Sequence, residues 1–189
     1  YLEEKDLIKD FKNYIGSSAG AIIIFFLIIG YKSEEIIEIL IREINNIINL
    51  NYDNIDNFLI DYGIDNTDKN KEILKKYLYK KIKLNDITFI EFTKKYGINL
   101  VITGTNLTTR ETDYFNVDNN PDMSIIDALI ITSCIPLIYK PIEYNDNLYI
   151  DGGIYNNFAY NYFENKNDTL GINITYNYSR KNDTFINYF

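Results

Sequence analysis

Ser18 stands out in the sequence because of the small residues around it. It is the central residue of Gly16-Ser17-Ser18-Ala19-Gly20, and an apolar run that extends to Ile29 follows directly. This G-x-S-x-G pattern is typical of a nucleophile elbow, a sharp turn between a strand and a helix that leaves a serine hydroxyl exposed. A turn of small residues without chemistry is the alternative interpretation of the same pentapeptide.

The elbow interpretation makes specific demands on the residues around the serine. Ser18 has glycine at the second position before and after it, which Ser17 lacks. We expect a side chain at Gly16 or Gly20 to collide with the neighbouring strand or helix. The backbone N–H of Ala19 would lie at the N-terminus of the helix, where it can stabilise a developing oxyanion.

The sequence contains no histidine, which excludes a Ser-His-Asp triad. A serine nucleophile would then need a carboxylate or a lysine as its proton acceptor. Asp151 is the best carboxylate, because it follows the strand-like run Leu148–Ile150 and precedes Gly152 and Gly153. This glycine pair can adopt positive φ and leaves space beside the carboxylate. Lys140 is a rival base, and it would have to act in its neutral form.

Ser18 and Asp151 together, without histidine, resemble the patatin-like phospholipase family over nearly the whole chain. Three further segments resemble that family in the same order: Thr103–Thr109, between the two motifs; Thr132–Pro136, like its Ser-x-x-Pro segment; and Asn156-Asn157, after the Asp-Gly-Gly. The resemblance implies a lipid acyl hydrolase with Ser18 as nucleophile and Asp151 as proton acceptor. It implies no metal and no cofactor, and a lipid or phospholipid ester substrate at a membrane or micelle surface.

The sequence departs from the family pattern in two places. No Gly-rich oxyanion loop precedes the first helix, and Phe158 and Ala159 stand where the family usually has a proline. The sequence begins with Tyr1, and its single methionine is Met123. We therefore expect residues 1–189 to form a single patatin-like catalytic domain that lacks the N-terminal strand and the Gly-rich loop. A catalytically impaired module that binds lipid or protein is the alternative function, and an unrelated α/β domain is a third.

Composition excludes several other classes of protein. A net charge of −8 disfavours a nucleic-acid partner, whose phosphates require clustered Lys and Arg. Cys134 is the single cysteine, so no internal disulfide can form and a reducing compartment is permitted. The apolar run Ala19–Ile29 is much shorter than the ~20 residues of a transmembrane helix. We expect no transmembrane segment, and a cytoplasmic or membrane-peripheral location.

The elements that must position these residues follow from apolar periodicity and capping signals. Helices are predicted over Leu2–Phe11, Ala19–Ile29, Ser33–Ile48, Lys71–Lys83, Thr88 to before Gly97, and Ile125–Cys134. Strands are predicted over Tyr14–Ile15, Leu100–Thr103, Thr112–Val117, Ile142–Tyr144, Leu148–Ile150 and Thr169–Tyr176. This order predicts an α/β fold, a three-layer α/β/α sandwich with a mostly parallel central sheet, in which Ser18 and Asp151 both lie at strand ends on one edge.

Three segments leave two interpretations open. The long connection Asn49–Asn70 is a candidate lid or membrane-proximal loop. The broad apolar stripe of the helix that begins near Ser33 predicts a core helix, or else a face that meets lipid. The Lys-rich helix Lys71–Lys83 presents a solvated face, or else a basic patch for phospholipid headgroups.

Overall fold

The computed structural model describes residues 10–48, 62–164 and 169–174. The chain divides into a large unit, Tyr1–Ala159, and a small unit, Tyr160–Phe189. In chain order, the large unit contains β1 (Asn13–Gly16), α1 (Ala19–Ile28), α2 (Ser33–Ile48), β2 (Gly63–Asp65), α4 (Asp68–Ile82), α5 (Phe89–Tyr96), β3 (Asn99–Asn106), β4 (Glu111–Phe115), α6 (Ile125–Thr132), β5 (Leu137–Tyr139), β6 (Ile142–Tyr144), β7 (Asn147–Asp151) and α7 (Gly153–Asn156). The small unit contains the 3-10 helix η3 (Tyr160–Tyr162).

A five-stranded sheet is built around β3, in the order β1-β3-β7-β6 with β4 also paired to β3. β1 runs parallel to β3, whereas β4 and β7 run antiparallel to it and β6 runs antiparallel to β7. The expected α/β fold is therefore confirmed, but the sheet is mixed rather than mostly parallel. Short turns join β3 to β4 and β6 to β7, which makes these pairs antiparallel, because a parallel pair would need a long crossover. β3 and β7 are antiparallel although β4, α6, β5 and β6 lie between them in the chain. In the β6–β7 turn, Asn145 and Asp146 both have positive φ.

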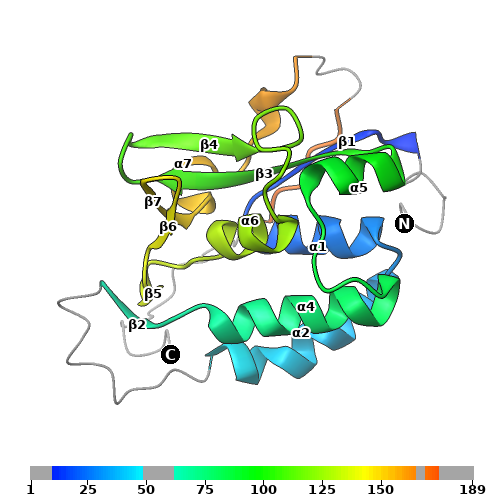
Figure 1. The fold of residues 1–189 in the computed structure, drawn as a ribbon, viewed down its shortest axis with the longest axis horizontal. Helices are drawn as coiled ribbons and strands as arrows, with labels where there is room; N and C mark the ends of the chain where they lie inside the picture. The colour runs from blue at the N-terminus through cyan, green and yellow to red at the C-terminus, as the bar shows by residue number, and fades with distance from the viewer. Residues whose placement is uncertain (1–9, 49–61, 165–168, 175–189) are drawn as a thin grey trace, which may run out of the picture. The chain divides into compact units, whose positions relative to one another are not determined.

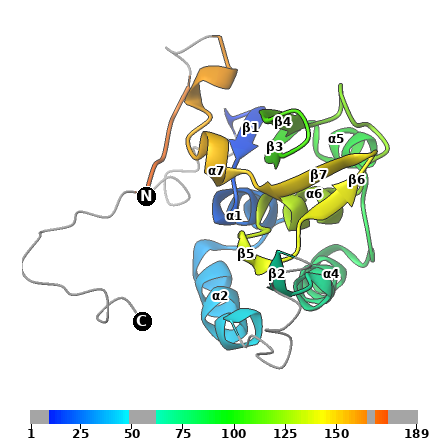
Figure 2. The same cartoon turned by 90° about the vertical axis from the view of Figure 1, so that its left-hand side faces the viewer.

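Helices lie on both faces of this sheet. On one face α1 and α6 lie next to the strands, and α4 and α2 form a further layer beyond them (Figures 1 and 2). On the other face the single-turn helix α7 contacts β3, where the Tyr155 N–H donates to Thr105 Oγ1 at 3.3 Å. The sheet is thus the middle layer, as the sandwich prediction requires.

The core forms where these layers meet. In α1, the side chains of Phe25 and Phe26 are buried, and the Phe25 ring stacks on Phe92 of α5 with centroids 5.8 Å apart. In α6, every residue except Asp127 is buried. Two predicted caps are confirmed: Thr88 and Glu91 form a capping box at the start of α5, and Ser124 accepts the Asp127 N–H at the start of α6.

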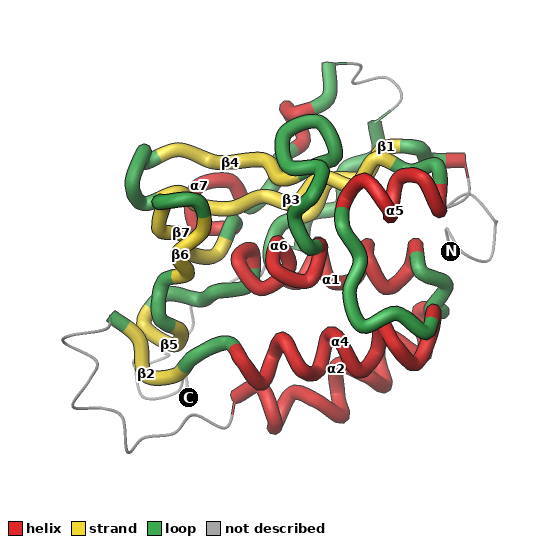
Figure 3. Tube along the Cα trace, viewed as in Figure 1, coloured by secondary structure: helices red, strands yellow, loops and turns green. Residues whose placement is uncertain are grey.

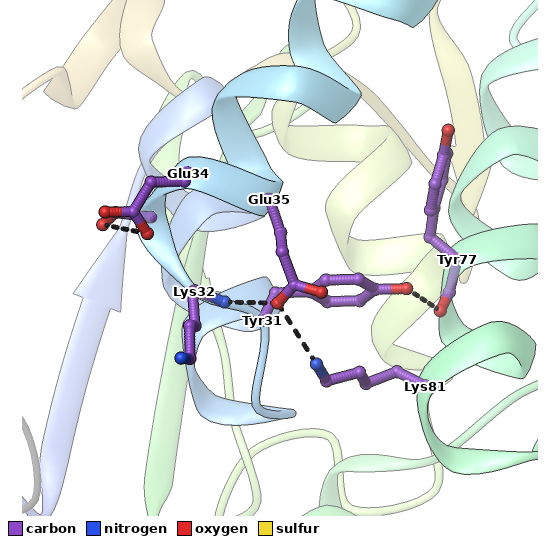
Figure 4. A network of polar contacts seen from close by, with 7 residues as sticks. Tyr31, Lys32, Glu34, Glu35, Tyr77 and Lys81 are labelled. Carbon is purple, nitrogen blue, oxygen red and sulfur yellow. Dashed lines mark hydrogen bonds and ion pairs between the residues drawn. The ribbon is translucent and has the colours of Figure 1, made fainter.

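A polar network ties the turn before α2 to α4 (Figure 4). The Tyr31 hydroxyl donates to the Tyr77 carbonyl at 2.9 Å. Glu35 Oε2 accepts the Lys32 N–H at 2.8 Å and lies 3.3 Å from Lys81 Nζ. These contacts fix the outer helical layer, because each one crosses between helices or closes the turn that joins them.

The apolar stripe of α2 is only partly buried. Ile36 and Ile39 pack into the core, whereas Ile37 and Ile41 are 56% and 67% exposed. Glu43 is buried despite its charge and accepts hydrogen bonds from the Tyr77 hydroxyl at 2.6 Å and from Lys76 at 2.9 Å. Over residues 33–43, the part of α2 whose side chains the structure describes, the prediction of a core helix therefore holds for one side of the helix.

Some predicted elements differ from the structure. β5 was not expected; it pairs with β2 as a separate two-stranded sheet, visible in Figure 3. The predicted strand Thr169–Tyr176 is wrong for residues 169–174, which form neither helix nor strand and pair with no described strand. Most of the predicted helix Leu2–Phe11 and of the long connection after Asn49 lies outside the described residues. None of the helices in the described part of the chain combines the length and apolarity that a membrane span requires.

Candidate active site

The strands β1 and β7 end at neighbouring positions along β3. Gly16, the last residue of β1, pairs with Ile102, and Asp151, the last residue of β7, pairs with Gly104. β1 is parallel and β7 antiparallel to β3, so their carboxyl ends approach each other on the edge opposite β4. Thr103 lies between the two pairing positions. This topology brings together the two sequence motifs that flank the site.

Ser18 occupies a strained position between β1 and α1. It is the N-cap residue of α1, with φ 50° and ψ −130°. Positive φ is uncommon outside glycine, and sparsely populated conformations of this kind cost about 1–3 kcal/mol and cluster at functional sites. Ala19 begins α1, so its N–H belongs to the first helical turn, which has no intrahelical acceptor.

The two elbow glycines differ in what they accommodate. A Cβ atom on Gly16 would lie 2.5 Å from Ala21 Cα, so this position requires glycine, as predicted. A Cβ atom on Gly20 would meet nothing within 4 Å. The expected collision at Gly20 is therefore wrong, because this residue lies on the exposed side of the first turn of α1.

The Ser18 hydroxyl donates a hydrogen bond to Asp151 Oδ2 at 2.5 Å, across 133 positions of the chain. The other carboxylate oxygen, Oδ1, accepts the Gly153 N–H at 2.7 Å, which orients the carboxylate toward Ser18. Asp151 is only 6% exposed, and burial raises its pKa against the opposing effect of these two hydrogen bonds. A raised pKa makes the carboxylate a stronger base.

The two glycines of the Asp-Gly-Gly motif lie where a side chain has little room, most of all at Gly152. A Cβ atom on Gly152 would lie 2.3 Å from Thr103 Oγ1, and one on Gly153 would lie 3.0 Å from Asp151 Oδ1. Neither glycine has positive φ, so the expected use of that conformation is not observed. These glycines permit the chain to turn closely around Asp151 and past β3.

The other serine of the elbow faces different partners. Ser17 Oγ lies 2.7 Å from Thr103 Oγ1 and donates to the Asn156 carbonyl at 3.2 Å. It thereby links β1, β3 and α7. Ser18, whose hydroxyl bonds to Asp151, is the serine that the glycine spacing indicated.

The end of α6 contacts both sides of the site. Thr132 Oγ1 accepts the Ser18 N–H at 2.8 Å, and the Thr132 carbonyl accepts the Gly152 N–H at 3.1 Å. The Asp151 N–H donates to the Cys134 carbonyl at 2.8 Å. Sequence reasoning assigned no role to Thr132. The available signal was a threonine at the end of an apolar helix, within the segment that resembles the Ser-x-x-Pro of the family.

Lys140, the rival base, contacts Asp65 and Cys134 through its backbone. Its backbone N–H donates to the Asp65 carbonyl at 3.1 Å, and its carbonyl accepts from Cys134 Sγ at 3.2 Å. The acceptor that faces the Ser18 hydroxyl is Asp151.

Comparison with known proteins now decides the family. Residues 1–163 match the family model described as "Patatin-like phospholipase". The chain belongs to the patatin-like phospholipase family. The resemblance inferred from the sequence motifs is confirmed, together with the α/β fold class.

Two viral proteins are similar to this family member. The chain is 35% identical over 172 residues to "Probable lipid hydrolase 463L" of Invertebrate iridescent virus 6, covering 85% of this chain and 57% of that protein. It is 30% identical over 163 residues to "Uncharacterized protein R571" of Acanthamoeba polyphaga mimivirus, covering 85% of this chain and 54% of that protein. The chain therefore spans about half the length of the curated relatives it matches.

The fold is also similar to a solved structure, the crystal structure of VipD from Legionella pneumophila. The TM-score is 0.50 at 17% sequence identity, over 82% of this chain and 42% of that chain. A likeness at this identity concerns the fold alone.

This patatin-like domain also carries an apolar cavity of ≈ 330 Å³. It is lined by Tyr62, Leu107, Pro136, Leu137, Tyr139, Pro141, Leu148 and Ile150. The cavity lies where the β2–β5 pair meets the ends of β3 and β7. Among the described residues, no group of three or more acidic, cysteine or histidine side chains could hold a metal ion.

Proposed function

We propose that this patatin-like protein is a serine-dependent lipid acyl hydrolase with Ser18 as nucleophile and Asp151 as proton acceptor. The observation that carries the proposal is the 2.5 Å hydrogen bond from Ser18 Oγ to Asp151 Oδ2, made by a serine in a strained elbow. A nucleophile within hydrogen-bond reach of an oriented base is the arrangement that covalent catalysis requires. Gly153 supplies the orientation through its N–H.

In the proposed acylation step, Asp151 takes the Ser18 hydroxyl proton while Oγ attacks the ester carbonyl carbon. The carbonyl oxygen becomes an oxyanion, which the Ala19 N–H stabilises at the N-terminus of α1. The tetrahedral intermediate collapses, its bond to the leaving alcohol breaks, and the alcohol takes the proton from Asp151. The product is an acyl ester on Ser18.

In the proposed deacylation step, Asp151 takes a proton from water as the water attacks the acyl ester. Collapse of the second intermediate releases the fatty acid and returns the proton to Ser18. One carboxylate thus accepts and then returns a proton in each of the two steps. A carboxylate is an intrinsically weak base for a hydroxyl, so the burial that raises the pKa of Asp151 favours this role.

The proposed substrate is a lipid or phospholipid ester presented at a membrane or micelle surface. Membership of the family and the name of the iridescent virus relative support a lipid substrate. The apolar cavity, whose lining includes neither Ser18 nor Asp151, offers apolar surface for contact with lipid. With a net charge of −8, contact with lipid would depend on apolar side chains rather than on attraction to anionic headgroups.

We propose further that additional oxyanion donors come from a Gly-rich loop outside residues 1–189. Loss of one oxyanion donor typically costs ~10²–10³ in rate. Residues 1–189 alone should therefore hydrolyse esters poorly, and a protein extended at the N-terminus should be active.

The test is hydrolysis of a p-nitrophenyl ester and of a phospholipid by the extended protein, together with labelling by a fluorophosphonate probe. We expect Ser18→Ala and Asp151→Asn each to abolish turnover, and Ser18→Ala to abolish labelling. Ser17→Ala is the matched control and should retain labelling, because Ser17 Oγ bonds to Thr103 and Asn156 rather than to Asp151. Full activity in Ser18→Ala would refute the proposal. An unlabelled, inactive wild-type protein would favour the binding module instead.

A further inference from the structure

We infer that Thr132 is a positioning residue that holds the nucleophile elbow and the aspartate strand in register. This inference rests on the proposed function, because it assigns Thr132 a role in aligning Ser18 with Asp151. It concerns the two oxygen atoms of Thr132, one in the side chain and one in the backbone.

The side-chain oxygen holds the elbow. Thr132 Oγ1 accepts the backbone N–H of Ser18 at 2.8 Å. Thr132 is 0% exposed, and removal of its hydroxyl would leave the Ser18 N–H without this acceptor. An N–H group that loses its partner within the fold costs free energy, and the hydrogen bond therefore constrains where the Ser18 amide points.

The backbone oxygen holds the aspartate side. The Thr132 carbonyl accepts the Gly152 N–H at 3.1 Å, and two residues later the Cys134 carbonyl accepts the Asp151 N–H at 2.8 Å. The end of α6 thus runs beside the end of β7. One buried residue contacts both chain segments, although 133 positions separate the serine from the aspartate.

The constraint matters because Ser18 is strained. At φ 50° and ψ −130° its backbone has an alternative at negative φ that is sterically easier. The bond to Thr132 fixes the orientation of the peptide group between Ser17 and Ser18, which sets φ of Ser18 and hence the direction of Oγ. Without it, we expect the elbow to relax and Oγ to move away from Asp151 Oδ2.

The same hydrogen bond determines which backbone N–H of the elbow can bind an oxyanion. The Ser18 N–H is committed to Thr132, so it is not available to an oxyanion. The amide left for that role is that of Ala19. Thr132 therefore gives the Ser18 N–H a structural role and leaves the adjacent Ala19 N–H for the oxyanion.

Substitutions at Thr132 can distinguish this role from simple packing. Valine has the shape of threonine but no acceptor, and serine keeps the acceptor but loses the methyl group. The matched control is Thr105→Val, because Thr105 is also a 0% exposed threonine whose Oγ1 accepts a backbone N–H, that of Tyr155 at 3.3 Å. Thr105 contacts neither Ser18 nor Asp151 through that bond.

The experiment measures three quantities in the full-length protein: the rate of fluorophosphonate labelling, kcat and KM for a p-nitrophenyl ester, and the thermal unfolding midpoint. For Thr132→Val we expect labelling and kcat to fall about 10²-fold, the size of effect that a misplacement of about 1 Å can have, with KM nearly unchanged. Thr132→Ser should restore both rates to within a few-fold of wild type. Thr105→Val should lower the unfolding midpoint without a comparable loss of labelling.

Each outcome has a consequence. Wild-type labelling in Thr132→Val, with Ser18→Ala unlabelled, would overturn the inference and leave the proposed function intact. Labelling that persists in Ser18→Ala would overturn the proposed function itself. If Thr132→Val does not fold, Thr132→Cys takes its place, because a thiol is a weak acceptor of similar size. Equal rates in the cysteine and serine variants would then overturn the inference.

Discussion

Gly16 and Asp151 are the last residues of two strands that meet along one edge of β3, where they pair with Ile102 and Gly104. The two strands approach from opposite directions because one is parallel to β3 and the other antiparallel. The elbow that follows Gly16 and the Gly-Gly turn that follows Asp151 therefore share one small region beside Thr103. The contact between Ser18 and Asp151 depends on this shared register.

The two elbow glycines should respond differently to alanine. Gly16→Ala places a Cβ atom 2.5 Å from Ala21 Cα, so the elbow must shift; we expect a loss of about 1–3 kcal/mol in the free energy of unfolding and loss of fluorophosphonate labelling. Gly20→Ala has open space in a helix and should gain about 0.5–1 kcal/mol with labelling retained. Denaturant unfolding and probe labelling of the two variants check this, and equal effects would contradict it.

The close approach of Gly152 to β3 involves backbone as well as side chain. A Cβ atom there would lie 2.3 Å from Thr103 Oγ1 and 2.4 Å from the Thr103 carbonyl oxygen. Gly152→Ala should therefore destabilise the protein by about 1–3 kcal/mol, and the added change Thr103→Ala should not rescue it, because the carbonyl remains. A double-mutant cycle in denaturant is the measurement. Full rescue would show that only the side chain was limiting.

The pH dependence of activity should reflect the buried carboxylate. The proposed base must be ionised, and burial raises the pKa of Asp151 above its ordinary value of 3.8. We therefore expect kcat/KM to rise with pH through a single acidic limb whose midpoint lies above 3.8, since kcat/KM reports the free enzyme. A pH series with a soluble ester measures this limb. A midpoint at or below the ordinary value would argue against the buried carboxylate as the base.

Asp151 should also lower stability at neutral pH. Between its ordinary and its raised pKa, the folded protein retains a proton that the unfolded chain has released, so wild-type stability falls as pH rises through this window. Asn does not titrate, so the stability of Asp151→Asn relative to wild type should increase across the window and then stay constant. Each unit of pKa elevation corresponds to about 1.4 kcal/mol.

Denaturant unfolding of Asp151→Asn and wild type at several pH values measures this difference. Asp146→Asn, in the exposed β6–β7 turn, is the control for the loss of one negative charge. A relative stability of Asp151→Asn that declined as pH rose would contradict the prediction.

Features set by local chemistry could be predicted from the sequence. The capping box of Thr88 and Glu91 involves residues three positions apart, and the structure contains it. The elbow at Ser18 was found for the same reason, since Gly16 answers a local steric demand, the close approach of Ala21. The family then followed from the order of such segments along the chain.

Features that depend on distant partners could not be predicted. Strand direction in the sheet and the β2–β5 pair depend on which segments meet in three dimensions, and apolar residues at 169–174 have no described strand beside them. Gly20 has open space around it because the first turn of α1 is exposed at that position, which the pentapeptide alone does not indicate. The role inferred for Thr132 rests on a hydrogen bond across 114 positions, which no pattern around residue 132 encodes.

The pairing of β1 and β7 along one edge of β3 has a consequence for the order in which the site forms during translation. A growing chain carries β1 and the elbow long before β7 is made, so the serine has no base until residues 147–151 emerge and dock. A nascent or truncated polypeptide that stops short of β7 would therefore carry the Ser18 hydroxyl without its proposed proton acceptor. Under the proposed function, ester hydrolysis would then require the fold to be complete through β7.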